Sequence, residues 1–271
     1  MALTLAHTFF RILLFVGSLS IFLVTPSSCL KPRKLLNATS YFSFEDFSSS
    51  EATFYGSPDG DGSEGGACGY GTAVGMPPFN SSISAGAPAI YQSGNGCGTC
   101  YQVKCTGNPA CSGNPVTVVI TDECPACDHD FDLSGRAFGS MARPGQADNL
   151  RKVGRIPVQY TRVPCNYPGV SITFRVDPGS NPDYFATLIE YEDGDGDLKS
   201  VELKEGLNSS TYESMQRSFG AVWKLNKGAQ LIAPFSLRLT QIESGKVFEA
   251  KNVIPVGYKP GQTFRAVGNF I

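Results

Sequence analysis

The chain has 271 residues, of which 17% are charged, and a formal net charge of −2. A protein that binds nucleic acid through phosphate contacts needs a basic face, so this balance argues against a nucleic-acid partner. The 30 glycines and 18 prolines, with frequent valine, isoleucine, threonine and phenylalanine, favour short strands and tight turns over long helices.

The N-terminal segment predicts secretion. Arg11 precedes an apolar stretch over residues 12–24, and Thr25, Ser27 and Ser28 follow it. This order is typical of a secretory signal peptide, which we assign to the first 28 residues. The alternative is a membrane anchor, but the apolar stretch is shorter than the roughly 20 residues that span a bilayer. We therefore expect an extracellular protein whose mature form has no membrane contact.

The next segment, residues 29–52, is polar and rich in serine, and we interpret it as a flexible N-terminal extension. A first domain follows over residues 53–166 and contains the clustered cysteines. Its expected strands lie at 101–105, 116–121 and 156–163, and its expected helices at 136–143 and 146–153, the second ended by Gly154.

Two cysteine pairs in the first domain have the CxxC spacing, Cys97 with Cys100 and Cys124 with Cys127. Such pairs can bind zinc, but the leader indicates an oxidising compartment, where cysteines pair as disulfides. We therefore expect disulfides, no metal site and no cofactor. Spacing alone leaves the connectivity open, and Cys29 is removed or remains as a free thiol according to the point of signal cleavage.

A short linker over residues 167–170 leads to a second domain over residues 171–271, which has no cysteine. Short strand-like runs separated by regular turn signals predict a two-sheet sandwich there. The strands are expected at 170–177, 184–192, 198–204, 219–225, 235–241, 246–250 and 263–267.

The run Asp193 to Asp197 alternates aspartate with glycine, as calcium loops do. A calcium loop of the EF-hand type would continue with glycine at 198 and glutamate at 204, where Leu198 and Lys204 stand. We interpret the run as a hairpin turn, because Asp-Gly favours positive φ.

Three acceptor sequences for N-glycosylation occur, at Asn37, Asn80 and Asn208. In a secreted chain such sites usually lie on surface loops. We expect a glycoprotein on this basis.

Several ordered motifs resemble those of the plant expansins, over nearly everything from residue 53 to the end. The motifs are Thr53–Gly56, Gly65–Gly71, Gly96–Cys100, Val118–Cys124, Asp130–Gly135 and Arg162–Cys165. Two further runs, Gly145–Leu150 and Ser218–Trp223, are similar to the β-expansin branch in particular.

The resemblance implies an all-β protein of two domains. The first would be a six-stranded double-psi β-barrel related to glycoside hydrolase family 45, and the second an immunoglobulin-like β-sandwich that binds carbohydrate. The implied disulfides are Cys68–Cys97, Cys100–Cys165 and Cys105–Cys111, and Cys124 and Cys127 are then left to pair with each other.

The resemblance also implies a groove in the first domain. Asp132 matches the general acid of the related hydrolases, and Asp122, Thr53 and Tyr55 match other groove residues. Glycosidic cleavage usually takes two carboxyl groups, but Gly56 stands where the hydrolases have their catalytic base. An acid without a base does not activate water efficiently, so we expect no hydrolysis.

Ordinary structural roles compete with these assignments. Asp132 could instead cap a helix and Asp122 could be a turn residue. The chain also departs from the family pattern, since Phe54, which we count among the polysaccharide-binding residues, replaces a tryptophan. Asp130 replaces the usual histidine and His129 lies one place away, so a like charge near Asp132 would raise the pKa of the pair.

Aromatic residues of the second domain are candidates for sugar stacking, because flat rings bury the apolar faces of sugars. By resemblance, Tyr184 matches a surface tyrosine that contacts glucan, and Phe219 stands where an exposed tryptophan is usual. Asn181 and Ser218 match polar neighbours of that surface. The alternative places both aromatic rings in the core, to which we assign Trp223.

Together these features predict a monomeric, secreted cell-wall-loosening protein that binds cellulose, xylan or other glucans and disrupts their non-covalent contacts without hydrolysis. One alternative is an endoglucanase with Asp132 as general acid. Another is a carbohydrate-binding wall protein that loosens nothing.

Overall fold

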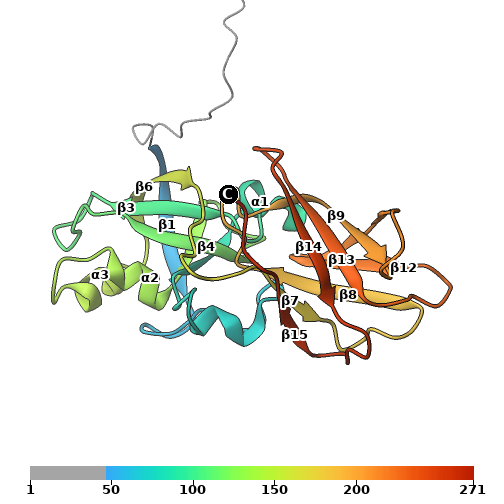
Figure 1. Ribbon diagram of the computed structural model, residues 1–271. Helices are drawn as coiled ribbons and strands as arrows, with labels where there is room; N and C mark the ends of the chain where they lie inside the picture. The colour runs from blue at the N-terminus through green and yellow to red at the C-terminus, as the bar shows by residue number, and fades with distance from the viewer. Residues whose placement is uncertain (1–46) are drawn as a thin grey trace, which may run out of the picture. The chain divides into compact units, whose positions relative to one another are not determined.

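Six strands close into a barrel in the first half of the chain, in the order β1-β5-β2-β4-β3-β6 (Figure 1). The structure is a computed structural model that describes residues 47–271. The predicted signal peptide, Cys29 and Asn37 lie outside the described residues. The strands are β1 Ser48–Tyr55, β2 Ile83–Gly86, β3 Cys100–Cys105, β4 Val116–Glu123, β5 Phe131–Ser134 and β6 Ile156–Val163.

Strand β1 begins earlier than the sequence suggested. Residues 48–52 pair antiparallel with β6, from Ser48 opposite Tyr160 to Ala52 opposite Ile156. The prediction of a flexible extension is therefore wrong for residues 48–52. Backbone pairing with β6 does not depend on side-chain polarity, which is why a polar run can complete the barrel.

Short helices fill the connections of the barrel. They are α1 Pro88–Tyr91, α2 Gly135–Ser140 and α3 Ala147–Val153, with 3-10 turns at Gly71–Gly75 and Gln92–Gly94. Ser134 caps α2, because its Oγ accepts a hydrogen bond of 3.0 Å from the Ala137 N–H. Asp132 is therefore not the helix cap and remains available for another role.

The second half forms two packed sheets, a β-sandwich (Figure 1). The four-stranded sheet contains β10 Glu213–Ser214, β9 Leu198–Glu205, β13 Phe235–Gln241 and β14 Val247–Ile254, in this order. The five-stranded sheet contains β11 Gln216–Phe219, β12 Val222–Asn226, β8 Tyr184–Glu190, β7 Thr173–Val176 and β15 Thr263–Arg265, also in order. The all-β, two-domain fold class is thus confirmed.

Two predictions about the sandwich need correction. The expected strand at 219–225 is split into β11 and β12 by a turn at Gly220, whose φ of +47° suits glycine. The Asp193–Asp197 run is not a hairpin turn, because β8 and β9, which it joins, belong to different sheets. Its carboxylates instead bind backbone donors, with Asp193 accepting from Tyr167 N at 2.6 Å.

Four disulfides lie in the first half, and they join the pairs that the resemblance implies. They are Cys68–Cys97, Cys100–Cys165, Cys105–Cys111 and Cys124–Cys127. Each of these eight sulfur atoms is bonded to its partner in one of the four disulfides. The cysteines of the CxxC pairs therefore do not present thiolates to zinc.

The barrel and the sandwich share one buried cluster within a single compact unit. It combines Tyr70 and Val119 of the barrel with Ala186 and Leu188 of the sandwich. Polar contacts join the two halves as well, since Arg162 of β6 forms an ion pair with Asp197 at 2.9 Å. Among residues 47–271, no helix is both long enough and apolar enough to span a membrane.

Candidate functional site

Thr53, Asp132 and His129 meet on the outer side of the barrel. The parallel register of β1 and β5 places Thr53 opposite Asp132, and the Thr53 hydroxyl donates to Asp132 Oδ1 at 2.5 Å. His129 Nε2 lies 2.9 Å from the same hydroxyl oxygen, which remains able to accept. The predicted groove residues Thr53 and Asp132 are therefore joined, with His129 as a third member.

The carboxyl of Asp132 is half-buried, and burial is the main reason that its pKa is raised. The hydrogen bond from Thr53 and the charge of His129 lower this pKa, whereas the charge of Asp122 raises it. A raised pKa favours the protonated form, which can donate a hydrogen bond to a sugar oxygen.

Asp122 lies near the C-terminal end of β4, where its charge acts on Asp132, and it is held by backbone donors. Its Oδ1 accepts from Ala67 N at 2.7 Å and from Glu123 N at 2.8 Å. The first bond ties the loop at residues 65–69 to this end of β4. Asp122 is thus more than a turn residue, because it fixes a segment distant in the sequence.

The expectation that Asp130 supplies the like charge near Asp132 is wrong. Burial and then the charge of Asp130 raise the pKa of Tyr160 on β6 to about 12, which places Asp130 beside that ring. Residues 128–130 form bends before β5 begins, so strand alternation does not extend back to Asp130. His129 faces the groove instead, a position that pattern matching did not assign.

Tyr55 follows Thr53 by two residues and therefore faces the same side of β1. Burial, and then the charge of Asp122, raise the pKa of the Tyr55 hydroxyl. The phenol consequently stays neutral and can donate a hydrogen bond. Phe54 lies on the opposite side, where its ring packs 5.1 Å from the ring of Phe138 against the barrel core.

The outer face of the five-stranded sheet carries Tyr184. Phe185 and Ile189 are buried in the sandwich core, whereas Ala186 and Leu188 pack toward the barrel, so alternation puts Tyr184 on the outer face. Tyr184 is partly exposed. Asn181 precedes it in an exposed turn and exchanges backbone hydrogen bonds of 2.8 and 3.2 Å with it.

Phe219 is 51% exposed at the end of β11. Its ring adjoins Gly69, where an added Cβ would lie 3.0 Å from the ring atom Cε2. Gly69 belongs to the same loop as Ala67, whose N–H binds Asp122, so this loop connects the exposed ring to Asp122. Ser218 beside it is half-buried, and Trp223 is 5% exposed in the sandwich core, as predicted.

Other acidic residues near the end of β1 point elsewhere. Asp59 forms an ion pair with Arg151 of α3 at 2.6 Å, and Asp61 accepts a hydrogen bond from the Ser81 hydroxyl. Neither is therefore directed at Asp132. Of the carboxylates in the described residues, Asp122 is the one whose charge acts on the pKa of Asp132.

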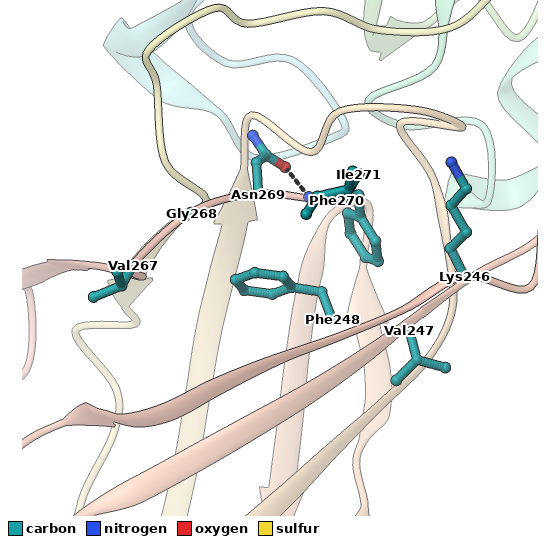
Figure 2. Close-up of a pocket in the computed structure, with 8 residues that line it drawn as sticks. All are labelled: Lys246, Val247, Phe248, Val267, Gly268, Asn269, Phe270 and Ile271. Atoms are coloured by element: carbon teal, nitrogen blue, oxygen red, sulfur yellow. Dashed lines mark hydrogen bonds between the residues drawn. The ribbon is translucent and has the colours of Figure 1, made fainter.

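A hollow of about 550 Å³ lies beside the C-terminal residues of the sandwich (Figure 2). It is lined by Lys246, Val247, Phe248, Val267, Gly268, Asn269, Phe270 and Ile271. None of them is a predicted sugar-binding residue, so the candidate site is an open surface rather than this hollow.

Two family models match the chain. One is described as the expansin C-terminal domain and matches residues 172–255, and the other is described as lytic transglycolase and matches residues 83–160. The matches cover most of the sandwich and most of the barrel.

A search of curated proteins found relatives along the whole chain. Putative expansin-B2 of Arabidopsis thaliana is 48% identical over 273 residues, which is 100% of both chains. Expansin-B11 of Oryza sativa subsp. japonica is 58% identical over 81% of this chain and 76% of its own length.

Solved structures show the same architecture. The crystal structure of the apo expansin of Clavibacter michiganensis matches with a TM-score of 0.64 and 21% identity, over 83% of this chain and 98% of that one. A closed six-stranded barrel followed by a two-sheet sandwich, with the expansin C-terminal model matching the second half, places the chain in the expansin class of two-domain proteins. The chain belongs to the expansin family, and its curated relatives are of the expansin-B group.

Proposed function

We propose that this chain is a secreted, non-hydrolytic protein that loosens plant cell walls by binding polysaccharide. The observation that carries the proposal is the surface that runs from Thr53 and Asp132, through Asp122 and its loop, to the exposed ring of Phe219. Such a surface offers hydrogen-bond donors and an aromatic platform along a single line.

The proposed mechanism is competition for contacts. A polysaccharide segment bound along this surface exchanges its hydrogen bonds with neighbouring chains for hydrogen bonds with the protein. Because each net hydrogen bond is worth only about 1 kcal/mol, local displacement requires neither covalent chemistry nor a cofactor. Wall tension then moves the released polymers.

The ligand in this proposal is a β-glucan or xylan chain. A mutant of the structurally similar bacterial expansin was crystallised with cellohexaose, which makes that oligosaccharide a reasonable first probe. We place the mature protein in the cell wall as a monomer. Asn80 and Asn208 are exposed and could carry glycans there.

The test combines extension and cleavage. A clamped, heat-inactivated wall strip should extend when purified protein is added, without release of reducing sugars. The D132N variant should lose extension, whereas D59N, whose carboxyl is 84% exposed and paired with Arg151, should retain it. New reducing ends that accumulate in step with extension would contradict the proposal.

An endoglucanase is the second candidate, because Asp122 shares the groove with Asp132. Its chemistry would require these two carboxyl groups to act as base and acid. Cleavage of cellohexaose that is lost in both D132N and D122N would favour the enzyme. Strong binding to wall polysaccharide without any extension would instead favour a binding protein that loosens nothing.

A further inference from the structure

The Cys124–Cys127 disulfide is more accessible than the other three. The six cysteines of those three bridges are at most 5% exposed, whereas Cys124 and Cys127 are both half-buried. Thiol–disulfide exchange begins when a thiolate reaches a sulfur atom, so access decides which bridge reacts first. Solvent can reach only this bridge readily.

The Cys124–Cys127 bridge also closes a smaller ring than any of the other three disulfides. Its cysteines are 3 residues apart, and Cys127 N donates to Cys124 O at 3.3 Å in the turn that follows β4. Cys124 N in turn donates to Gly86 O at 2.8 Å, which holds the turn against β2. Because so short a ring restricts little of the unfolded chain, the barrel does not depend on this bridge as it does on the longer ones.

A carboxyl group lies directly beside the two sulfur atoms. Both Sγ atoms and a carboxylate oxygen of Asp132 lie within 4.8 Å of one another. Burial raises the pKa of Asp132, so this carboxyl can carry a proton above its ordinary range. The groups that face it are Thr53 and Tyr55 on β1, Asp122 on β4 and His129 in the β4–β5 connection.

We infer that Cys124–Cys127 is a redox-active disulfide that exchanges with thiols in solution, and that Asp132 is the proton donor for this exchange. The reductant is a low-molecular-weight thiol or dithiol. Neither the expansin fold nor wall loosening requires such an activity, so the two can be tested separately.

A reductant thiolate attacks one sulfur, the S–S bond breaks, and the thiolate released on the other cysteine takes the proton of Asp132. A second reductant thiolate attacks the mixed disulfide and releases the first cysteine as a thiolate, which takes its proton from the solvent, where the two reductant thiols released theirs on ionising. Two reductant thiols are oxidised to one disulfide, Cys124 and Cys127 gain two electrons and two protons, and Asp132 regains its proton from water.

The first experiment measures which bridge opens. The mature protein is incubated with an excess of reduced dithiothreitol, quenched by alkylation at graded times, and mapped by mass spectrometry. Cys124 and Cys127 should be labelled at least about tenfold faster than any other cysteine. Cys105–Cys111 is the matched control, because it is also short, with a separation of 6, but buried. Opening of that bridge at the same rate would overturn the inference.

The second experiment tests the proton donor. The rate of reduction by dithiothreitol is measured from acidic to neutral pH and divided by the thiolate concentration. This normalised rate should fall as rising pH removes the proton of Asp132, and D132N should be flat and at least about tenfold slower at the acidic end of the range. In D122N the normalised rate should still fall with rising pH, but the fall should occur at a lower pH, because the charge of Asp122 raises the pKa of Asp132 in the wild-type protein.

D132E provides the check on folding, since it keeps a carboxyl near the sulfurs and should restore the pH dependence. The mass map of the other three bridges reports whether each variant has folded. A correctly bridged D132N with the wild-type profile would show that Asp132 donates no proton, and would overturn this part of the inference.

Discussion

The barrel and the sandwich are stabilised by different means. The barrel carries all four disulfides and the polar cluster of Thr53, His129 and Asp132, whereas the sandwich has no cysteine and buries Phe174, Phe185 and Phe235 completely. Polar groups in the cluster occupy places where apolar ones could pack, so covalent links offset part of the lost burial. The sandwich keeps its candidate binding surface on the outer face of one sheet, and its core is unaffected.

The largest effect should come from the sandwich core. Phe235→Ala removes a ring that packs 5.0 Å from Phe185, and we expect a loss of about 3–5 kcal/mol in the free energy of unfolding. Urea titration followed by the fluorescence of Trp223, the single tryptophan, reports this half of the molecule. Val247→Ala, at a site 58% exposed, should change stability by less than about 0.5 kcal/mol.

The stability lost when a disulfide of the barrel is removed should depend on the length of the loop that the disulfide closes. Replacing Cys100 and Cys165 by serine opens a bridge of separation 65 and should cost about 4 kcal/mol, whereas the same change at Cys124 and Cys127 should cost about 2 kcal/mol. Calorimetric unfolding measures both. Equal losses would show that loop entropy does not determine how these bridges contribute.

Two buried glutamates, Glu190 and Glu192, should make the free energy of unfolding depend on pH. Burial raises the pKa of Glu192 to about 8 and that of Glu190 to about 7. The folded state therefore holds protons that the unfolded state releases above pH 4.5, and stability falls as pH rises from about 4.5 to 8. Each such group contributes up to about 1.4 kcal/mol per pH unit.

Thermal unfolding at pH 5 and pH 8 measures this dependence. Glu192→Gln has no proton to release and should show a smaller difference between the two midpoints than the wild-type protein. An unchanged difference would assign the pH dependence to other groups.

The smallest expected effect concerns the exposed ring at the edge of the groove. Phe219→Ala should weaken binding to insoluble glucan about two- to tenfold, the range expected for one aromatic contact, and Phe219→Trp should strengthen it. Depletion assays with washed cell-wall glucan measure the affinity. Val247→Ala on the other sheet is the control, and a similar loss there would argue against a specific platform.

Local patterns determined much of this molecule. The cysteine cluster and the change to cysteine-free alternating strands predicted two halves of different construction, because such patterns reflect which residues can be buried or cross-linked. The resemblance added the barrel and the groove pair Thr53 and Asp132. Strands β2 and β5 were missed, since each has only four residues, too few for a pattern of alternation to identify a strand.

Tertiary structure alone decided the rest. Whether His129 or Asp130 faces Asp132 depends on bends before β5, and whether Phe54 faces the groove depends on the side of β1 that packs against Phe138. The proximity of Asp132 to the Cys124–Cys127 bridge likewise follows from the return of the chain into β5. The sequence shows which polar and aromatic side chains the chain contains, but the distances between these side chains are set by how the strands pair and how the chain turns between them.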